Sequence, residues 1–396
     1  MRVKPRTGVA ATLVALVVVS GFVVGTSLPG GGSSSPAAGT SGAAPAEPSA
    51  STSPGPSASP LPPPTKPVRP PAFAPTRLAP GERPPQFVVM SFDGAGNHDL
   101  FQHYLSVAER NKARFTFFLT GTYLLPEDLR TQYLPPGKPP GSSAVGFAAR
   151  AAFPNRIADL TQAWAARHEI GTHFNGHFCD AAGVGTWDAA AWRSEITQFN
   201  DFLDNWRARV GTPALKPLPF DHTEVVGGRT PCLDGRRDQM LPVFKEFGYR
   251  YDASDPGKLR WPVLLPAGLW QFPLQAVNRA GTDKQNLSMD YNFYVNQSGG
   301  KDVAGDSARA VEQQTYDSLL NAYNAVHTGN RAPLFVGSHF NLWSEGAYRN
   351  ALTRFADAVC TQPDTRCISN RDLADWLDAQ DPAVLAALQA QPIQGQ

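Results

Sequence analysis

The chain has 396 residues, 42% of them hydrophobic and 17% charged, which is enough to bury the core of one large domain or two small ones. Its 35 basic and 34 acidic residues nearly balance, so nothing in the charge indicates a nucleic-acid or acidic partner. The 37 prolines and 35 glycines are unevenly spread, and their distribution sets the domain boundary.

The N-terminal end has the pattern of an export signal. Arg2, Lys4 and Arg6 precede an apolar stretch over residues 9–24. With its flanks this stretch approaches the ~20 residues that span a bilayer. We expect residues 1–28 to be a signal peptide or a single-pass anchor, the anchor being slightly favoured, with the rest of the chain outside the cell.

The next segment, residues 29–84, consists almost entirely of Pro, Ala, Gly, Ser and Thr. Such a composition lacks the apolar residues needed to offset chain ordering, so it predicts a disordered spacer. The folded domain is then expected over residues 85–380, and residues 381–396 form an Ala/Gln-rich tail that is expected to fray.

Within the expected domain, apolar runs alternate with amphipathic stretches. The clearest helix is predicted over 187–209, where aromatic and aliphatic residues recur every three or four positions; two others are predicted over 306–327 and 370–379. The predicted strands are residues 86–92, 115–120, 168–173, 224–229, 249–253, 269–274 and 333–339. This alternation indicates parallel strands in an α/β fold, either open or closed into a barrel.

Polar side chains follow these runs where the strands end, and functional groups gather at the carboxyl ends of parallel strands. They are Asp93, His173, Arg229, Asp252, Asp255 and His339. Taken singly, Asp93 is equally explained as a turn or cap residue, Arg229 as an ion-pair partner and His339 as a core histidine. Their joint appearance at successive strand ends favours a catalytic site.

The stretch "HEIGTHFNGHF" places His173 and His177 four residues apart. On a helical turn such a pair shares one face and reaches one metal ion, although two ordinary surface histidines would give the same spacing. No Glu lies between them, which excludes the protease helix in which that Glu is the base.

Four cysteines permit disulfides outside the cell. Cys360 and Cys367 close the short loop "CTQPDTRC" and are the favoured pair. Cys179 and Cys232 are left to pair with each other, or to stay reduced and buried.

The order of these residues resembles the polysaccharide deacetylases of carbohydrate esterase family 4, the NodB homology domain. The resemblance spans residues 85–380 and rests on five short motifs. They read Ser91-Phe92-Asp93-Gly94 for T-F-D-D-G, His173 to His177 for H-[ST]-x-x-H, Arg229-Thr230-Pro231-Cys232 for R-x-P-Y, Asp252 to Pro256 for D-S-x-D-W, and Gly337-Ser338-His339 for L-x-H.

The resemblance implies a distorted (β/α) barrel of about seven parallel strands and a set of site residues. His173 and His177 would hold a divalent metal, Zn²⁺ or alternatively Co²⁺. Asp93 would be the general base, oriented by Arg229. The remaining roles are an oxyanion donor at the backbone N–H of Cys232 and a general acid at His339, tuned by Asp255.

One position departs from the family pattern. Gly94 stands where the family has a second Asp, its third metal ligand, and catalytic zinc usually has three protein ligands. His98, Asp99 or Asn175 would complete the shell, or Asp93 would itself bind the metal beside a different base. In the third alternative, hydrolysis is lost and only glycan binding is kept.

We therefore expect a monomeric, exported hydrolase that removes acetyl groups from an N-acetylated polysaccharide such as peptidoglycan or a chitin-like polymer. A catalytically inactive glycan-binding module is the alternative, and an enzyme with Cys232 as a nucleophile is a remote third. The Pro- and Gly-rich strip 121–150 is too long for an ordinary connection, so we expect it to form part of the substrate wall.

Overall fold

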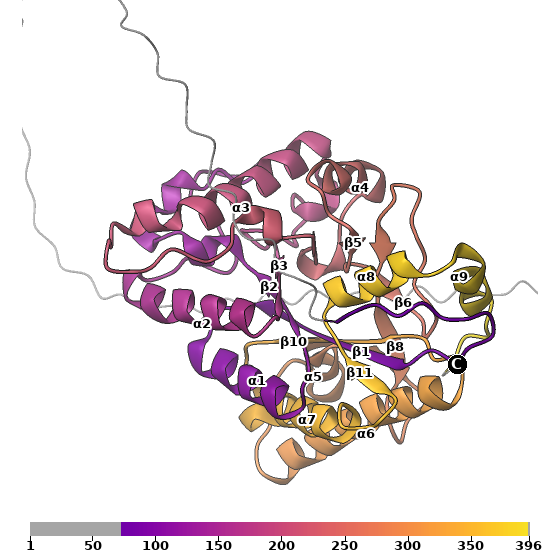
Figure 1. Cartoon of the computed structure of the whole chain (residues 1–396). Helices are drawn as coiled ribbons and strands as arrows, with labels where there is room; N and C mark the ends of the chain where they lie inside the picture. Colours follow the sequence, from indigo (N-terminus) through magenta and orange to yellow (C-terminus); the bar gives the residue numbers. More distant parts are fainter. Residues whose placement is uncertain (1–72, 395–396) are drawn as a thin grey trace, which may run out of the picture. The chain divides into compact units, whose positions relative to one another are not determined.

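The computed structural model describes residues 73–394 (Figure 1). Parallel strands run through the centre of the domain in the order β10-β1-β2-β3-β4-β5-β7, and β11 pairs with the first half of β1. These strands are β1 (Gln86–Gly94), β2 (Thr116–Leu119), β3 (Glu169–Thr172), β4 (Gly227–Gly228), β5 (Tyr251–Asp252), β7 (Trp270–Gln271), β10 (Leu334–His339) and β11 (Thr365–Cys367).

A second, smaller sheet continues the curl of the first. Its order is β6-β8-β9, with β6 (Pro256–Gly257) following β5, β8 (Leu274–Asn278) following β7, and β9 (Gln285–Leu287) antiparallel to β8. A bridge from Met289 to Gly337 brings the chain after β9 back to β10. The strands therefore curl into the distorted (β/α) barrel that the sequence predicted.

Helices surround the strands (Figure 1). They are α1 (His98–Arg110), α2 (Phe153–Ala165), α3 (Ala189–Val210), α4 (Arg237–Glu246), α5 (Asp290–Ser298), α6 (Asp306–Thr328), α7 (Trp343–Val359), α8 (Asn370–Ala379) and α9 (Pro382–Gln389). The aromatic face predicted on 187–209 is buried on α3, including Trp192, Phe199 and Trp206, so that periodicity reported core packing.

All seven predicted strands exist, but three are much shorter than expected. β4, β5 and β7 are two residues long: the 3₁₀ turn η6 (Pro231–Leu233) follows closely after β4, and the chain leaves the first sheet for the second after Asp252. β8, β9 and α5 were not predicted, since residues 275–298 carry no clear hydrophobic period.

Both edges of the expected domain need correction. Leu78 is buried and its N–H donates to Gln380 Oε1, so ordered packing begins before residue 85. At the other end, the expected frayed tail contains α9, which buries Val384 and Leu388 because these residues recur four apart on one helix face. The predicted export segment and most of the predicted spacer lie outside the described residues. No helix within residues 73–394 has the length and apolar character to cross a bilayer.

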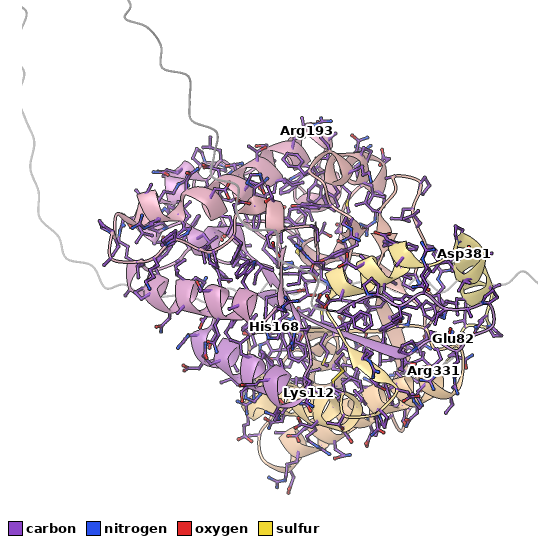
Figure 2. All side chains as sticks on the ribbon, in the orientation of Figure 1. Glu82, Lys112, His168, Arg193, Arg331 and Asp381 are labelled. Atoms are coloured by element: carbon purple, nitrogen blue, oxygen red, sulfur yellow. A yellow bond between two sulfur atoms is a disulfide. The ribbon has the colours of Figure 1, made fainter. Side chains whose placement is uncertain are left out.

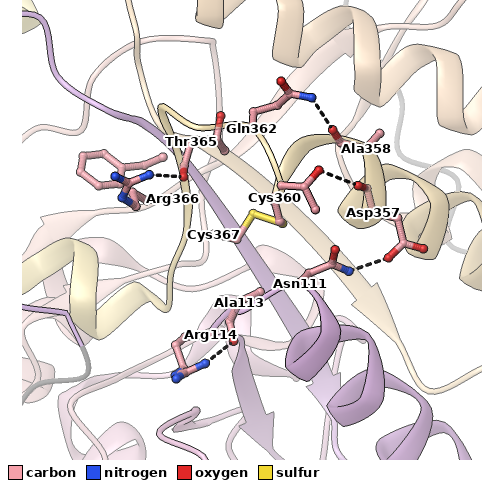
Figure 3. Close-up of a disulfide and its surroundings, with 12 residues drawn as sticks. Asn111, Ala113, Arg114, Asp357, Ala358, Cys360, Gln362, Thr365, Arg366 and Cys367 are labelled. Atoms are coloured by element: carbon pink, nitrogen blue, oxygen red, sulfur yellow. Dashed lines mark hydrogen bonds between the residues drawn. A yellow bond between two sulfur atoms is a disulfide. The ribbon is translucent and has the colours of Figure 1, made fainter.

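Both disulfides form: the favoured Cys360–Cys367 pair is confirmed, and Cys179 with Cys232, which the sequence left either paired or reduced, is also bonded. Cys360–Cys367 ties the end of α7 to β11, and Figure 3 shows it beside the hydrogen bond from Asn111 to Asp357. Cys179–Cys232 links the loop after β3 to the loop after β4. The second bridge therefore joins two loops that carry predicted site residues.

Candidate active site

A cavity of about 430 Å³ lies at the carboxyl ends of the central strands. Four side chains predicted from the sequence line it: Asp93, His173 and His339 from the strand ends, and His177 from its spacing to His173. In the register of β1 with β10, Asp93 is the direct partner of His339. Neighbouring strands lie roughly 4.8 Å apart, so the expected base and acid are lateral neighbours in one sheet.

Asp93 forms a buried ion pair with Arg229. Arg229 Nη1 donates to Asp93 Oδ1 at 2.8 Å, and each side chain is 2% exposed. Burial alone would raise the pKa of Asp93, but the adjacent guanidinium and the nearby His173 and His339 outweigh it and lower that pKa. Arg229 is fixed in turn by donating through Nε to the Ala253 carbonyl at 3.0 Å. The carboxylate is thus ionised and held in one orientation, as expected of a positioned base.

His173 and His177 converge, with 5.0 Å between their ring centroids. His173 Nδ1 contacts the Arg229 carbonyl at 2.8 Å, which places a proton on Nδ1 and leaves Nε2 as the free acceptor. Burial lowers the pKa of His173 and lowers that of His177 to about 3, so both rings are neutral at pH 7. Neutral imidazoles are the form that binds metal ions.

The predicted reason for this convergence is wrong, however. Residues 173–177 form a loop rather than a helical turn, because Phe174 and His177 adopt φ of +57° and +54°. Buried Glu195 on α3 holds the loop by accepting from the Asn175 N–H at 2.9 Å and from the Tyr133 hydroxyl at 2.9 Å. The positive φ angles turn the two rings toward each other without a shared helix face.

His339 is oriented by Asp290, the first residue of α5. Its Nδ1 lies 2.7 Å from Asp290 Oδ1, and Asp290 Oδ2 accepts from the His339 N–H at 2.7 Å. Burial disfavours the imidazolium, but the Asp290 carboxylate outweighs that effect and raises the pKa of His339. A histidine that stays protonated near neutral pH suits a general acid.

The tuning role predicted for Asp255 is therefore wrong. Asp255 accepts from Arg237 and from Gln271 Nε2, and it makes no contact with His339 among the described residues. Asp252 also pairs with Arg237, at 2.9 Å. The fourth motif thus forms a charged cluster around one arginine, because the chain turns outward into β6 at this point.

Cys232 is placed by its disulfide beside the histidine loop. Its partner Cys179 has its Sγ 3.7 Å from His177 Nδ1. The Cys232 N–H has no acceptor in the part of the chain that the structure describes, which leaves it available as a donor, although Cys232 does not line the cavity. A nucleophilic role is excluded in this state because its sulfur is bonded.

The residues suggested as a third metal ligand are engaged elsewhere. His98 Nδ1 lies 2.8 Å from Asp159, and Asp99 is exposed on α1. Asn175 Nδ2 donates to the Glu195 carbonyl at 2.8 Å; its Oδ1 is buried without a partner among the described residues, but Asn175 does not line the cavity. Within residues 73–394, the grouping of three His, Cys or carboxylate donors within 4.8 Å is His177 with the two disulfide-bonded cysteines. The donor set that fits a divalent cation is therefore the neutral imidazole pair, with Asp93 on the same cavity wall.

The Pro- and Gly-rich strip forms part of that wall, where the sequence placed it. It folds through 3₁₀ turns η1 (Gly121–Leu124), η2 (Glu127–Gln132) and, at its end, η3 (Arg150–Ala152). Val145, Phe147 and Ala148 line the cavity and contribute apolar surface to it.

Two site residues were missed from the sequence. Asp290 opens an unpredicted helix 49 residues before His339, and no motif connects the two positions. Arg156 lines the cavity from α2, and its sequence context is an ordinary amphipathic helix. Only the three-dimensional placement identifies either one.

No family model and no curated protein matches the chain. Solved structures to which it is similar include a candidate polysaccharide deacetylase from Mycobacterium smegmatis, with 16% identity, a TM-score of 0.46, and coverage of 77% of this chain and 96% of that one. A family 4 carbohydrate esterase from Streptomyces lividans in complex with acetate has 11% identity, a TM-score of 0.35 and coverage of 73% and 92%. A pseudoenzyme of the same family from Bacillus anthracis has 11% identity, a TM-score of 0.39 and coverage of 77% and 70%. These descriptions name the family that the five motifs resemble.

Proposed function

We propose that the chain is a metal-dependent hydrolase that removes acetyl groups from an N-acetylated extracellular or cell-surface polysaccharide, such as peptidoglycan or a chitin-like polymer. One observation carries the proposal. A single cavity is lined by an ionised, oriented carboxylate, two neutral imidazoles and a third imidazole whose pKa is raised, at the strand ends where such sites occur.

In this proposal His173 and His177 hold the cation, for which the family resemblance implies zinc or alternatively cobalt. When bound, the cation supplies Lewis acidity to the acyl carbonyl and to the attacking water. The two imidazoles lack a third ligand, because position 94 is Gly and not Asp. We therefore expect weaker metal binding than at a site with three protein ligands.

The remaining steps belong to the chain's own residues. Water attacks the acetyl carbon, and its proton passes to Asp93, which Arg229 keeps ionised and aimed at the cavity. The carbon–nitrogen bond then breaks as His339 delivers a proton to the departing nitrogen. Acetate and a free amine result, and a proton moved from Asp93 back to His339 resets the site. The backbone N–H of Cys232 remains the proposed oxyanion donor.

The apolar wall from the 121–150 strip supports a role in seating substrate beside the acyl group. An extracellular location is supported by the N-terminal export pattern and by two disulfides. Membrane contact is proposed only through the N-terminal segment, and the monomeric state also remains a proposal.

The test measures acetate release from N-acetylglucosamine oligomers and from peptidoglycan with added zinc or cobalt. Wild type should release acetate, and His173→Ala should release at least about a hundredfold less because it removes one of two cation ligands. Arg193→Gln, which changes an exposed cation paired with Glu246, is the matched surface control.

One observation favours a second function, a glycan-binding module without hydrolysis. Gly94 replaces the family's second carboxylate, and Asp93 does not form a three-donor cluster with both histidines among the described residues. Binding of the oligomers without acetate release under either metal would establish this alternative.

A further inference from the structure

Arg156 is a buried cation on the cavity wall that the proposed reaction does not use. Its residue is 7% exposed, and it lines the same cavity as Asp93 and the three histidines. Its Nη2 donates to the Gly96 carbonyl at 2.8 Å and its Nη1 to the Tyr123 carbonyl at 3.3 Å. The guanidinium carbon lies 5.1 Å from the centre of the Tyr123 ring. Every contact made by this cation is with a neutral group.

No carboxylate in residues 73–394 forms an ion pair with Arg156. The nearest candidate along α2 is Asp159, but its oxygens already contact His98 Nδ1 and Gln102 Nε2. Burying a charge without a carboxylate in direct contact is costly; burial lowers the pKa of Arg156, and Asp159 offsets this only partly and through space. A buried cation of this kind is expected where a bound ligand supplies the negative charge.

The other charges around the cavity cancel locally. Asp93 is matched by Arg229, and His339 is matched by Asp290. Arg156 differs from these groups because it lines the cavity without a carboxylate in direct contact among residues 73–394, and the nearby Asp159 does not line the cavity.

We propose that Arg156 is a specificity-determining residue that receives a carboxylate carried by the sugar chain, so that the preferred substrate is an acidic N-acetylated polysaccharide. This inference rests on the proposed function and adds its substrate class. The planar guanidinium matches the two oxygens of a carboxylate, and a charge-assisted contact in a partly closed cavity is stronger than one in water.

The experiment compares two substrates that differ only in that charge. The first is peptidoglycan glycan freed of peptides, in which alternate sugars carry a lactyl carboxylate; the second is the same glycan with those carboxylates converted to neutral methyl amides. Wild type should hydrolyse the acidic strands with a kcat/KM at least about tenfold higher, the size of one charge-assisted hydrogen bond.

Arg156→Gln should lose that preference by slowing the acidic substrate about tenfold while leaving the neutral one within about twofold. Arg156→Lys, which keeps the charge but not the planar fork, should fall between. Arg193→Gln removes an exposed cation at the outer surface of α3 (Figure 2) and should change neither rate.

Equal losses on both substrates would overturn the inference, because they would mean that Arg156 only braces the loops at Gly96 and Tyr123. A wild type that hydrolyses both strands equally would overturn it too, without any variant having to fold. If no substrate releases acetate, the proposed function fails. Calorimetric binding of the two strands then still decides the inference, since only a carboxylate contact makes the acidic strand bind more tightly to wild type than to Arg156→Gln.

Discussion

Replacing Asp290 by asparagine tests how the proposed general acid is kept protonated. The carboxylate contacts His339 Nδ1 at 2.7 Å and is 8% exposed. Asparagine keeps the shape and an acceptor oxygen but removes the charge. A hydrogen bond to a charged group contributes about 1.5–3 kcal/mol against about 0.5–1.5 kcal/mol for a neutral one. The loss of roughly 1–1.5 kcal/mol corresponds to about one pKa unit.

The raised pKa of His339 determines in which direction the pH profile of the variant should move. Asp290 raises the pKa of His339, so wild type retains its acid as the pH rises, and Asp290→Asn loses it about one unit earlier. The alkaline limb of kcat/KM for acetate release should move down by that amount. At a pH above both limbs the variant should be about tenfold slower, and at pH 5.5 nearly equal to wild type.

Asp255→Asn is the matched control, because it removes the carboxylate that the sequence suggested for the same task. It should leave the alkaline limb in place, since Asp255 pairs with Arg237. An unmoved limb in Asp290→Asn, or an equal shift in both variants, would refute the assignment of His339 as an acid tuned by Asp290.

Four other perturbations of the site have definite outcomes. His177→Ala should weaken zinc binding by at least about tenfold in calorimetry; unchanged affinity would remove this residue from the ligand set. Gly94→Asp should tighten zinc binding, because a Cβ there meets nothing closer than 3.8 Å, and should cost about 1–2 kcal/mol in denaturant unfolding because φ is +99°. Burial raises the pKa of Glu195 from 4.5 to about 7, so the stabilising effect of the protonated carboxyl is present at low pH and is lost as the pH rises through 7. The free energy of unfolding of the wild type should therefore fall between pH 5 and 8, and that of Glu195→Gln should fall less. Reduction of Cys179–Cys232 should lower acetate release and zinc affinity together, and a Cys179→Ala/Cys232→Ala double variant should be insensitive to the reductant; persistent sensitivity would assign the effect to the other bridge.

Much of the site was predictable because apolar runs in the sequence indicate where the strands end. Asp93, His173, Arg229 and His339 each follow an apolar run, and parallel strands bring such positions to one edge. The Cys360–Cys367 bridge was predicted from the short loop between the two residues, whereas the bond between Cys179 and Cys232 was left open. These inferences depend on local pattern and on a general property of parallel sheets.

The remainder depended on contacts between distant segments. Asp290, and not the predicted Asp255, lies beside His339 because the Met289–Gly337 bridge anchors α5 next to β10. No hydrophobic periodicity in the sequence indicates this bridge. The orientation of His177 depends on its positive φ, a conformation that non-glycine residues seldom adopt and that sequence does not indicate. Arg156 could be recognised as a candidate binding residue only from the structure, which places it on the cavity wall without a carboxylate in direct contact among the described residues.

The pairing of Asp93 with His339 across β1 and β10 has a consequence for how such a chain diversifies. The distance between Asp93 and His339 is set by the backbone hydrogen bonds between β1 and β10, whereas part of the cavity wall comes from the separate 121–150 strip. Chimaeras that exchange this strip are therefore expected to change which glycan the proposed hydrolase accepts while leaving the pairing of Asp93 with His339 unchanged.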